Sequence, residues 1–196
     1  MGLVTMFVDS LKEVCSTPQG IAAEIFGILA LIVSIICYQL NTQKKILVAQ
    51  MIAATMFIFN CFLLGAPAGA WLNVHGIIRA LIFSQKGKRK WCGSRITLII
   101  LIIAAGLICL FTAETGSVKD IIVSILPFIG TVFTTISLSM TDAAKIRKLT
   151  LPSPPCWFIY HLAHTNVGGC LNEIFVFCSI IVGWLRLDRK GDGKKA

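Results

Sequence analysis

Hydrophobic residues occur along this chain in long runs that are separated by short polar stretches. Seven runs can be delimited, at residues 21–37, 46–64, 68–83, 96–113, 121–140, 149–163 and 167–185. Most approach the roughly 17–25 apolar residues with which an α-helix crosses a bilayer. The third run is interrupted by Asn73, His75 and Arg79, and the sixth is short and opens among prolines. The pattern predicts an all-α integral membrane protein with seven transmembrane helices.

The overall composition agrees with this interpretation. Of the 196 residues, 56% are hydrophobic and 14% are charged, and the mean hydropathy is +0.84. A soluble domain is about half apolar and about a quarter charged. The low charge content and the long apolar runs exclude an ordinary water-soluble enzyme, a disordered chain and a fibrous protein.

Positive charge is concentrated in alternate connections between the runs. The bases after the first, third, fifth and seventh runs are Lys44, Lys45, Lys86, Lys88, Arg89, Lys90, Arg95, Lys145, Arg147, Lys148, Arg186, Arg189, Lys190, Lys194 and Lys195. Basic loops stay in the cytoplasm, so the amino terminus is expected outside and the carboxyl tail inside. The net charge of +9 therefore indicates topology and contact with the lipid bilayer. Nucleic acid is not expected as a partner, because no basic stretch is interleaved with stacking aromatic residues.

The first 20 residues differ from a secretory signal, because Asp9, Lys12 and Glu13 interrupt them. Their apolar residues recur at helical spacing, which predicts a short amphipathic helix lying at the outer membrane interface. A frayed tail is the alternative. Residues 1–20 are therefore assigned to an extracytoplasmic amino-terminal segment.

The chain also repeats itself weakly, at an offset of about 99 residues. Gly69-Ala70-Trp71-Leu72-Asn73 aligns with Gly168-Gly169-Cys170-Leu171-Asn172. Each unit has three runs, a basic first loop and an uncharged second loop. We expect a first three-helix repeat at 21–90, a linker helix within 91–117, a second repeat at 118–190 and a cytoplasmic tail at 191–196. The single linker crossing restores the orientation, so the two repeats would be parallel, in a 3+1+3 arrangement.

This topology resembles that of the SWEET sugar transporters and the wider PQ-loop superfamily. The resemblance implies alternating access, in which two three-helix units rock around a central crevice. Neither repeat contains a Pro-Gln pair, which is a departure from the superfamily's pattern. Pro127 and Pro152 lie near the places where proline hinges are expected, and we treat them as candidate hinges.

Three motifs carry a closer resemblance. They are Leu63-Leu64-Gly65-Ala66-Pro67-Ala68-Gly69-Ala70, then Ile125-Leu126-Pro127-Phe128-Ile129-Gly130-Thr131, and Cys156-Trp157-Phe158-Ile159-Tyr160-His161 followed by Gly168-Gly169. Together they resemble the YgjV-type bacterial inner-membrane proteins. The resemblance implies a bacterial inner (plasma) membrane location and no established activity. The proline-rich start of the sixth run and the long amino-terminal segment depart from that family.

Polar residues inside the apolar runs are the candidate functional residues, because burying them in a bilayer is expensive. Asn73 and Asn172 occupy equivalent positions in the two repeats. An amide supplies two donors and two acceptor lone pairs, so a facing pair can hold a small polar solute. In SWEET-like proteins an asparagine on each third helix has this role. The alternative is that each asparagine bonds a neighbouring helix.

Other polar residues lie at similar depth. Trp157 is a candidate floor for a substrate site and His161 a candidate substrate-binding residue, and ordinary helix packing is the alternative for the tryptophan. Glu173 and His75 are candidates for proton coupling, since a buried carboxylate and imidazole can exchange protons. A water-exposed acid at a helix mouth is the alternative for Glu173. Arg79 is a candidate gate or lipid contact, and it is close enough to the cytoplasmic end to snorkel.

No cofactor, metal site or enzymatic activity is expected. The 8 cysteines contain no C-x-x-C pair, and no nucleophile–base set or metal-binding helix motif is present. A disulfide between Cys15 and Cys170 stays open. Two functions remain: a carrier for a small polar solute, or a non-transporting scaffold or lipid-binding accessory protein. Whether the chain forms a homo-oligomer also stays open.

Overall fold

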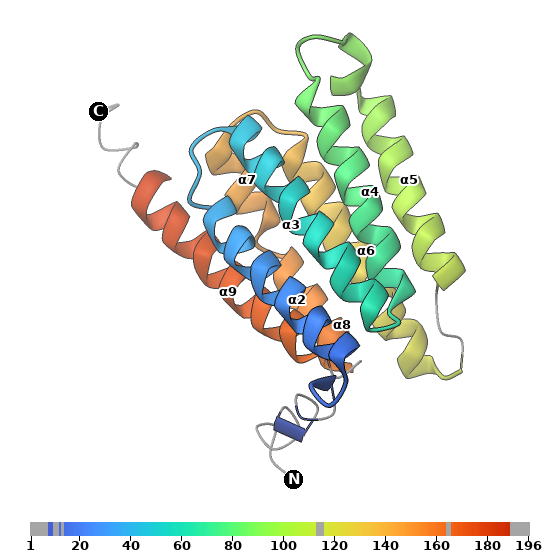
Figure 1. Cartoon of the computed structure of the whole chain (residues 1–196). Helices are drawn as coiled ribbons and strands as arrows, with labels where there is room; N and C mark the ends of the chain where they lie inside the picture. Colours follow the sequence, from blue (N-terminus) through green and yellow to red (C-terminus); the bar gives the residue numbers. More distant parts are fainter. Residues whose placement is uncertain (1–7, 10–11, 13, 113–115, 164–165, 189–196) are drawn as a thin grey trace.

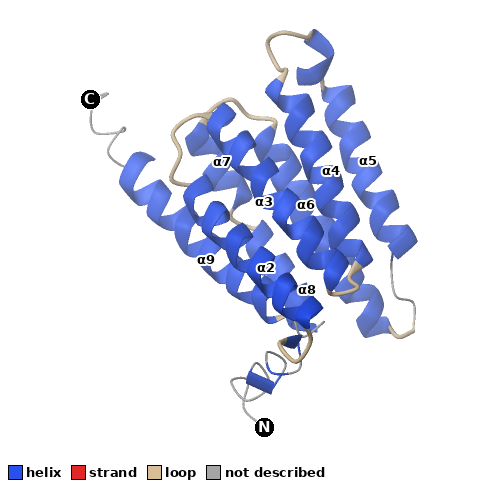
Figure 2. Ribbon diagram, in the orientation of Figure 1, coloured by secondary structure: helices blue, strands red, loops and turns tan. Residues whose placement is uncertain are grey.

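The computed structural model describes residues 8–9, 12, 14–112, 116–163 and 166–188, which form a helical bundle without strands (Figures 1 and 2). The all-α prediction is confirmed. The predicted tail at 191–196 and much of the predicted segment at 1–20 lie outside the described residues. The helices are α2 (Pro18–Cys37), α3 (Gln43–Leu63), α4 (Pro67–Ser84), α5 (Arg95–Thr112), α6 (Val118–Leu138), α7 (Ala143–Thr150), α8 (Ser153–Ala163) and α9 (Val167–Gly183). A short 3-10 helix η1 (Lys90–Gly93) precedes α5, and a π-helical turn η2 (Trp184–Asp188) extends α9.

Side-chain caps decide where several helices begin. The Thr17 hydroxyl accepts a hydrogen bond from the Gly20 amide at 3.1 Å, so α2 begins before the apolar run that predicted it. The Asp142 carboxylate caps α7 and the Asn166 side chain caps α9 in the same way. Such caps satisfy amide donors that the first helical turn leaves without partners. Hydrophobicity therefore located the helices, while short polar residues fixed their starts.

The sixth apolar run is not one helix, which corrects its predicted bounds of 149–163. It falls instead on α7 and α8, which are separated at Leu151 and Pro152. Proline lacks an amide hydrogen, and its ring clashes with the preceding turn, so a helix breaks there. Pro154 and Pro155 lie in the first turn of α8, where a missing amide hydrogen costs nothing.

Five of the described helices are long and apolar enough to cross a membrane: α2, α3, α5, α6 and α9 with its extension. The outward faces of these helices are rich in exposed large aliphatic residues. On α5 these are Ile96, Ile99, Ile100, Ile103, Leu107 and Leu110. Many of the buried side chains, by contrast, are threonine, serine, asparagine, histidine or arginine. An apolar exterior around a partly polar interior is suited to lipid as the solvent.

The helices are arranged in two rows (Figure 1). In the first row α3 packs against both α2 and α4, and in the second α8 packs against both α6 and α9. The rows meet where α2 packs against α9. Helix α5 lies at the edge of the bundle, against α4 and α6.

Hydrogen bonds between loops show that alternate connections meet at the same end of the bundle. Gln43 Nε2 donates to the Leu138 carbonyl at 2.9 Å, and Lys86 Nζ donates to the Ser139 carbonyl at 2.6 Å. At the opposite end, Gln19 Nε2 donates to the Leu63 carbonyl at 2.9 Å. We call the end that carries residues 38–43, 85–94, 139–142 and η2 the basic end. An apolar core that includes Ile46, Leu47, Phe83, Leu138, Ile146 and Ile180 fills the bundle there.

Candidate functional site

A cavity of about 140 Å³ lies between the two rows of helices. It begins near Cys61, Gly69 and His161 at the end opposite the basic end, and it continues to Tyr38 and Thr150. Side chains from α2, α3, α4, α6, α7, α8 and α9 line it. Helix α5 is fully described and supplies none of them. One water needs about 10–15 Å³ by this measure, so the cavity has room for about ten.

Most of the residues singled out from the sequence meet at this cavity. Those that line it are Asn73, Arg79, Trp157, His161, Asn172 and Glu173. They come from only three helices, α4, α8 and α9. The sequence argument from buried polar groups therefore led to one place in the fold.

The two equivalent asparagines have different surroundings. Asn73 is partly exposed, and its Nδ2 donates to the Gly69 carbonyl of its own helix at 2.8 Å. Asn172 is 5% exposed, and its Nδ2 donates to Glu173 Oε1 at 2.9 Å. Asn172 Oδ1 is buried and accepts no hydrogen bond from the described residues. The amide of Asn172 thus has a free acceptor at the cavity, so the two halves of the site are not mirror copies.

Trp157 forms an aromatic wall on one side of the cavity. Its ring stacks on that of His161, with centroids 5.8 Å apart and 27° between the planes, and it meets Tyr160 edge to face. Its position depends on Gly130 of α6, where a Cβ atom would lie 2.7 Å from Trp157 Cδ1. Only glycine lets α6 approach the indole this closely.

Arg79 points into the bundle and not toward lipid. It is 6% exposed, and its Nη1 donates to the Thr135 hydroxyl on α6 at 2.9 Å. Its Nε has no partner among the described residues. This corrects the expectation that Arg79 snorkels to a lipid phosphate, because the inward guanidinium lines the cavity instead. A role in gating stays a prediction.

His75 lies away from the cavity, at the contact between α4 and α5. It is 4% exposed, and its Nε2 is 3.0 Å from the Leu101 carbonyl. Successive faces of α4 therefore have different roles: one side presents Asn73 and Arg79 to the cavity, and the other holds α5. The structure does not bring His75 together with Glu173, the other residue predicted to couple protons.

The two candidate hinge prolines occupy different settings. Pro127 is fully buried inside α6, which continues past it. Pro152 lies in the break between α7 and α8. Only the second interrupts the helical backbone, and movement at either stays a prediction.

Several hydroxyl groups at the site were missed from the sequence. Thr134 Oγ1 donates to Ser153 Oγ at 2.9 Å, and Thr150 Oγ1 donates to Ser137 Oγ at 2.7 Å, which joins α6 to α7 and α8. Threonine and serine are tolerated in apolar helices because they can also bond their own backbone. The available signal was their spacing, since residues 131, 134, 135 and 137 recur on one side of α6.

A family model described as bacterial inner membrane protein, Imp-YgjV, matches residues 21–191. The chain belongs to the Imp-YgjV family. The match includes α2 from residue 21 onward, every helix from α3 to α9 and all residues that line the cavity, and it confirms the resemblance found in the sequence motifs. No curated protein and no solved structure matches the chain. This Imp-YgjV chain is thus a multi-pass bacterial inner-membrane protein, and its likeness to SWEET and PQ-loop transporters stays a prediction.

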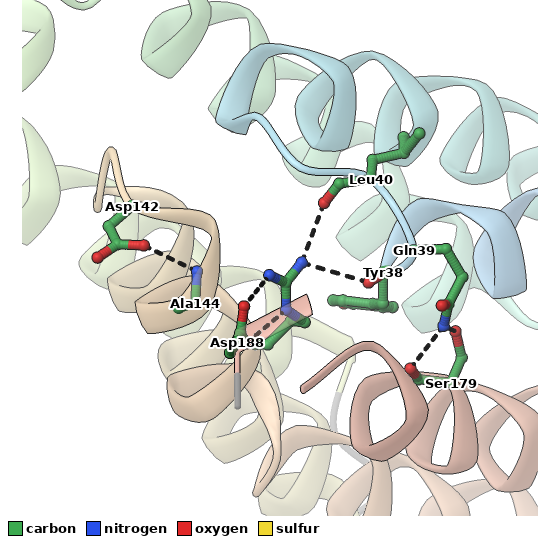
Figure 3. A network of polar contacts seen from close by, with 8 residues as sticks. Tyr38, Gln39, Leu40, Asp142, Ala144, Ser179 and Asp188 are labelled. Atoms are coloured by element: carbon green, nitrogen blue, oxygen red, sulfur yellow. Dashed lines mark hydrogen bonds and ion pairs between the residues drawn. The ribbon is translucent and has the colours of Figure 1, made fainter. Parts of the chain in front are cut away.

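A buried ion pair closes the basic end of this Imp-YgjV chain (Figure 3). Arg147 of α7 is 2% exposed, and one edge of its guanidinium pairs with both carboxylate oxygens of Asp188 of η2, as Nε donates to Oδ2 at 2.9 Å and Nη2 to Oδ1. Its Nη1 donates to the Leu40 carbonyl at 3.0 Å and to the Tyr38 carbonyl at 3.4 Å. One side chain therefore ties α7, η2 and the loop after α2 together. The sequence analysis counted Arg147 only as a loop base.

A second contact joins α2 to α9 nearby, as Figure 3 also shows. Gln39 Nε2 donates to both the carbonyl and the hydroxyl of Ser179, at 2.8 and 2.9 Å. The Ser179 hydroxyl in turn donates to the Ile35 carbonyl. Together with the ion pair, these bonds hold the two rows of helices in contact at the basic end.

The cysteines and acidic residues form no metal site in the described part of the chain. All eight cysteines are free thiols, including Cys15, which is exposed, and Cys170, which is buried. The disulfide that the sequence left open is therefore not formed in this structure.

Proposed function

We propose that this Imp-YgjV protein is a seven-span carrier that moves a small polar solute by alternating access between two three-helix units. The observation that carries the proposal is the cavity. It is lined in part by polar side chains, it lies between the two rows of helices, and both rows contribute side chains to it. Polar, partly unpaired groups at membrane depth are costly to maintain, so a functional role is the default expectation.

The spacing of the helix starts supports the 3+1+3 arrangement. Pro18, Gln43 and Pro67 begin α2, α3 and α4, and α6, α7 and α9 begin 100 residues later, at Val118, Ala143 and Val167. In this arrangement α7 and α8 together correspond to α3 and make one broken crossing. Helix α5 acts as the linker, since it lies at the edge of the bundle and takes no part in the cavity.

The basic end is proposed to face the cytoplasm, because loops rich in lysine and arginine are retained there. The amino terminus would then be outside and the carboxyl terminus inside. The apolar core, the ion pair and the Gln39 contact would then lie at the inner face. Labelling of a tag at each terminus in intact cells tests this, and labelling of both tags from one side would contradict it.

Uptake into proteoliposomes tests transport directly. The purified protein is reconstituted and exposed to a panel of labelled solutes, alongside Asn73→Ala, Asn172→Ala and the control Ile103→Ala on the exposed face of α5. We expect the control to match wild type. Loss of a buried amide partner costs about 1–3 kcal/mol, so Asn172→Ala should weaken transport about fivefold to 150-fold. If wild type and both asparagine variants behave alike for every solute, the carrier proposal is wrong and the scaffold or accessory role gains support.

A further inference from the structure

Among the described residues two arginines are buried, and their electrostatic settings are opposite. Arg147 has a carboxylate partner, Asp188. Arg79 has none, because no carboxylate oxygen of the described residues lies within 4.0 Å of its nitrogens. Its one side-chain partner is the neutral hydroxyl of Thr135, and its Nε is unpaired. A guanidinium keeps its charge in proteins, and burying a charge without a counterion is strongly unfavourable. The cavity around Arg79 is therefore electrostatically suited to an anionic group.

Acceptor groups lie elsewhere in the same cavity. Glu173 carries a carboxylate, and the neighbouring Asn172 is 5% exposed with an unpaired Oδ1. Asn172 Nδ2 donates to Glu173 Oε1, which orients the amide so that its oxygen is left for another donor. A carboxylate and a carbonyl oxygen together favour a ligand with several N–H donors and a positive charge, such as an ammonium.

Arg79 and Glu173 occupy different positions along their helices. Helices α4 and α9 both run toward the basic end from similar starts, at Pro67 and Val167. Arg79 lies six residues further along its helix than Glu173 does along α9, so at 1.5 Å per residue their backbone positions differ by about 9 Å along the helix axes, counted from the helix starts. The volume of about 140 Å³ admits a short molecule that carries both charges and excludes a bulky one.

One wall of the cavity is aromatic. Trp157 lines the cavity, is stacked on His161 and is held against Gly130. An indole face covers the apolar part of a ligand and attracts an ammonium through its π electrons. A neutral polyol would bring no opposite charge to either Arg79 or Glu173, so the cavity disfavours it.

We propose that the ligand of this cavity is a small zwitterion, whose carboxylate pairs with Arg79 and whose ammonium is held by Glu173 and Asn172. The inference rests on the proposed function only in naming the same molecule as the transported solute. The site itself can be tested by binding alone.

Binding to the purified protein in nanodiscs is measured by calorimetry with a matched set of ligands. Glycine, L-alanine and β-alanine carry both charges, N-acetylglycine lacks the ammonium, glycinamide lacks the carboxylate, and glycerol lacks both. Removing one partner of a buried charge pair weakens binding by at least about thirtyfold. We expect the zwitterions to bind and the other three ligands to bind at least that much more weakly. N-acetylglycine or glycinamide binding as tightly as glycine would overturn the proposal.

Variants test which residue binds which charged group of the ligand. Arg79→Gln should weaken glycine at least about thirtyfold and leave glycinamide unchanged, whereas Glu173→Gln should weaken glycine and leave N-acetylglycine unchanged. Lys145→Gln, on the exposed surface of α7, is the control. Arg79→Lys keeps the charge and should retain more glycine binding than Arg79→Gln. Melting temperatures identify a misfolded variant, and the wild-type ligand series decides the question in that case.

Uptake in proteoliposomes separates this inference from the proposed function. Uptake of glycine or alanine supports both. Uptake of a neutral solute without zwitterion binding overturns the inference and leaves the carrier standing. Zwitterion binding without uptake of any solute supports the site and overturns the carrier.

Discussion

Removing the Asp188 carboxylate tests how much its ion pair with Arg147 stabilises the basic end of the bundle. In the wild-type structure Asp188 neutralises Arg147, and both side chains are nearly inaccessible, at 10% and 2% exposed. Asp188→Ala leaves a buried guanidinium with only the carbonyls of Leu40 and Tyr38 as acceptors. Neither carbonyl carries a full negative charge.

The expected cost follows from this geometry. Removing one partner of a buried ion pair costs about 3–5 kcal/mol, because the remaining charge is uncompensated. For a chain of this size each kcal/mol lowers the melting temperature by about 2–4 °C, so Asp188→Ala should lower it by about 6–20 °C. Arg147→Met combined with Asp188→Leu removes both charges. The double variant should recover much of the loss, though not all, because Leu40 still loses its donor.

The assay is thermal unfolding in one detergent, followed by intrinsic fluorescence, for wild type, Asp188→Ala, the two single variants Arg147→Met and Asp188→Leu, and their double variant. Lys145→Met is the matched control, since Lys145 lies on the same helix and is exposed. Its effect should stay within about 0.5 kcal/mol, or roughly 2 °C. The two single losses should exceed the double loss by at least about 2 kcal/mol.

Two results would refute this reasoning. The first is an Asp188→Ala protein that melts as Lys145→Met does. The second is a double variant whose loss equals the sum of the two single losses. Either would mean that the apolar core alone holds the basic end together.

Three further substitutions probe other parts of the structure. Gly130→Ala places a Cβ atom 2.7 Å from Trp157 Cδ1, so the indole must move. We expect the free energy of unfolding to fall by about 1–3 kcal/mol and the KM for uptake to rise. An unchanged KM would argue against Trp157 as a wall of the site. Asn60→Ala removes a buried hydrogen bond of 2.8 Å from the Asn60 amide to the Ala23 carbonyl. We expect the free energy of unfolding to fall by roughly 1–3 kcal/mol, with a lower melting temperature. A loss no larger than that of an alanine substitution at an exposed position would contradict the contact. Pro152→Ala restores an amide hydrogen at the break between α7 and α8. If Pro152 is a hinge, the variant should have a lower maximal uptake rate at unchanged KM. A maximal rate equal to that of wild type would mean that Pro152 is not a hinge.

Much of the fold was accessible from the sequence, because the signals that define membrane helices are local. The apolar runs predicted the helices that the structure describes, with the sixth divided at Pro152. The alternating basic loops predicted which connections share an end, and the hydrogen bonds of Gln43 and Lys86 connect such loops. The weak repeat anticipated the regular spacing of the helix starts.

The candidate site was accessible in part. Asn73, Asn172, Trp157, His161, Glu173 and Arg79 were chosen because polar groups are costly at membrane depth, and all of them line one cavity. The same argument selected His75, which instead contacts the Leu101 carbonyl on α5. The argument also missed the hydroxyl groups of α6, because threonine and serine cost little free energy in a membrane helix. The free-energy cost of burying a polar group in the membrane identifies which residues need partners, but it does not say which partners they have.

The sequence by itself determined the membrane location, the approximate helix positions and the family, since composition, run length and motif order are properties of neighbouring residues. Only the tertiary structure decided that Arg147 is paired while Arg79 is not, and that the two equivalent asparagines have different partners. The physical reason is that electrostatic and hydrogen-bond energies depend on distances across helices. Those distances are set by how the two rows pack, which no single stretch of the chain encodes.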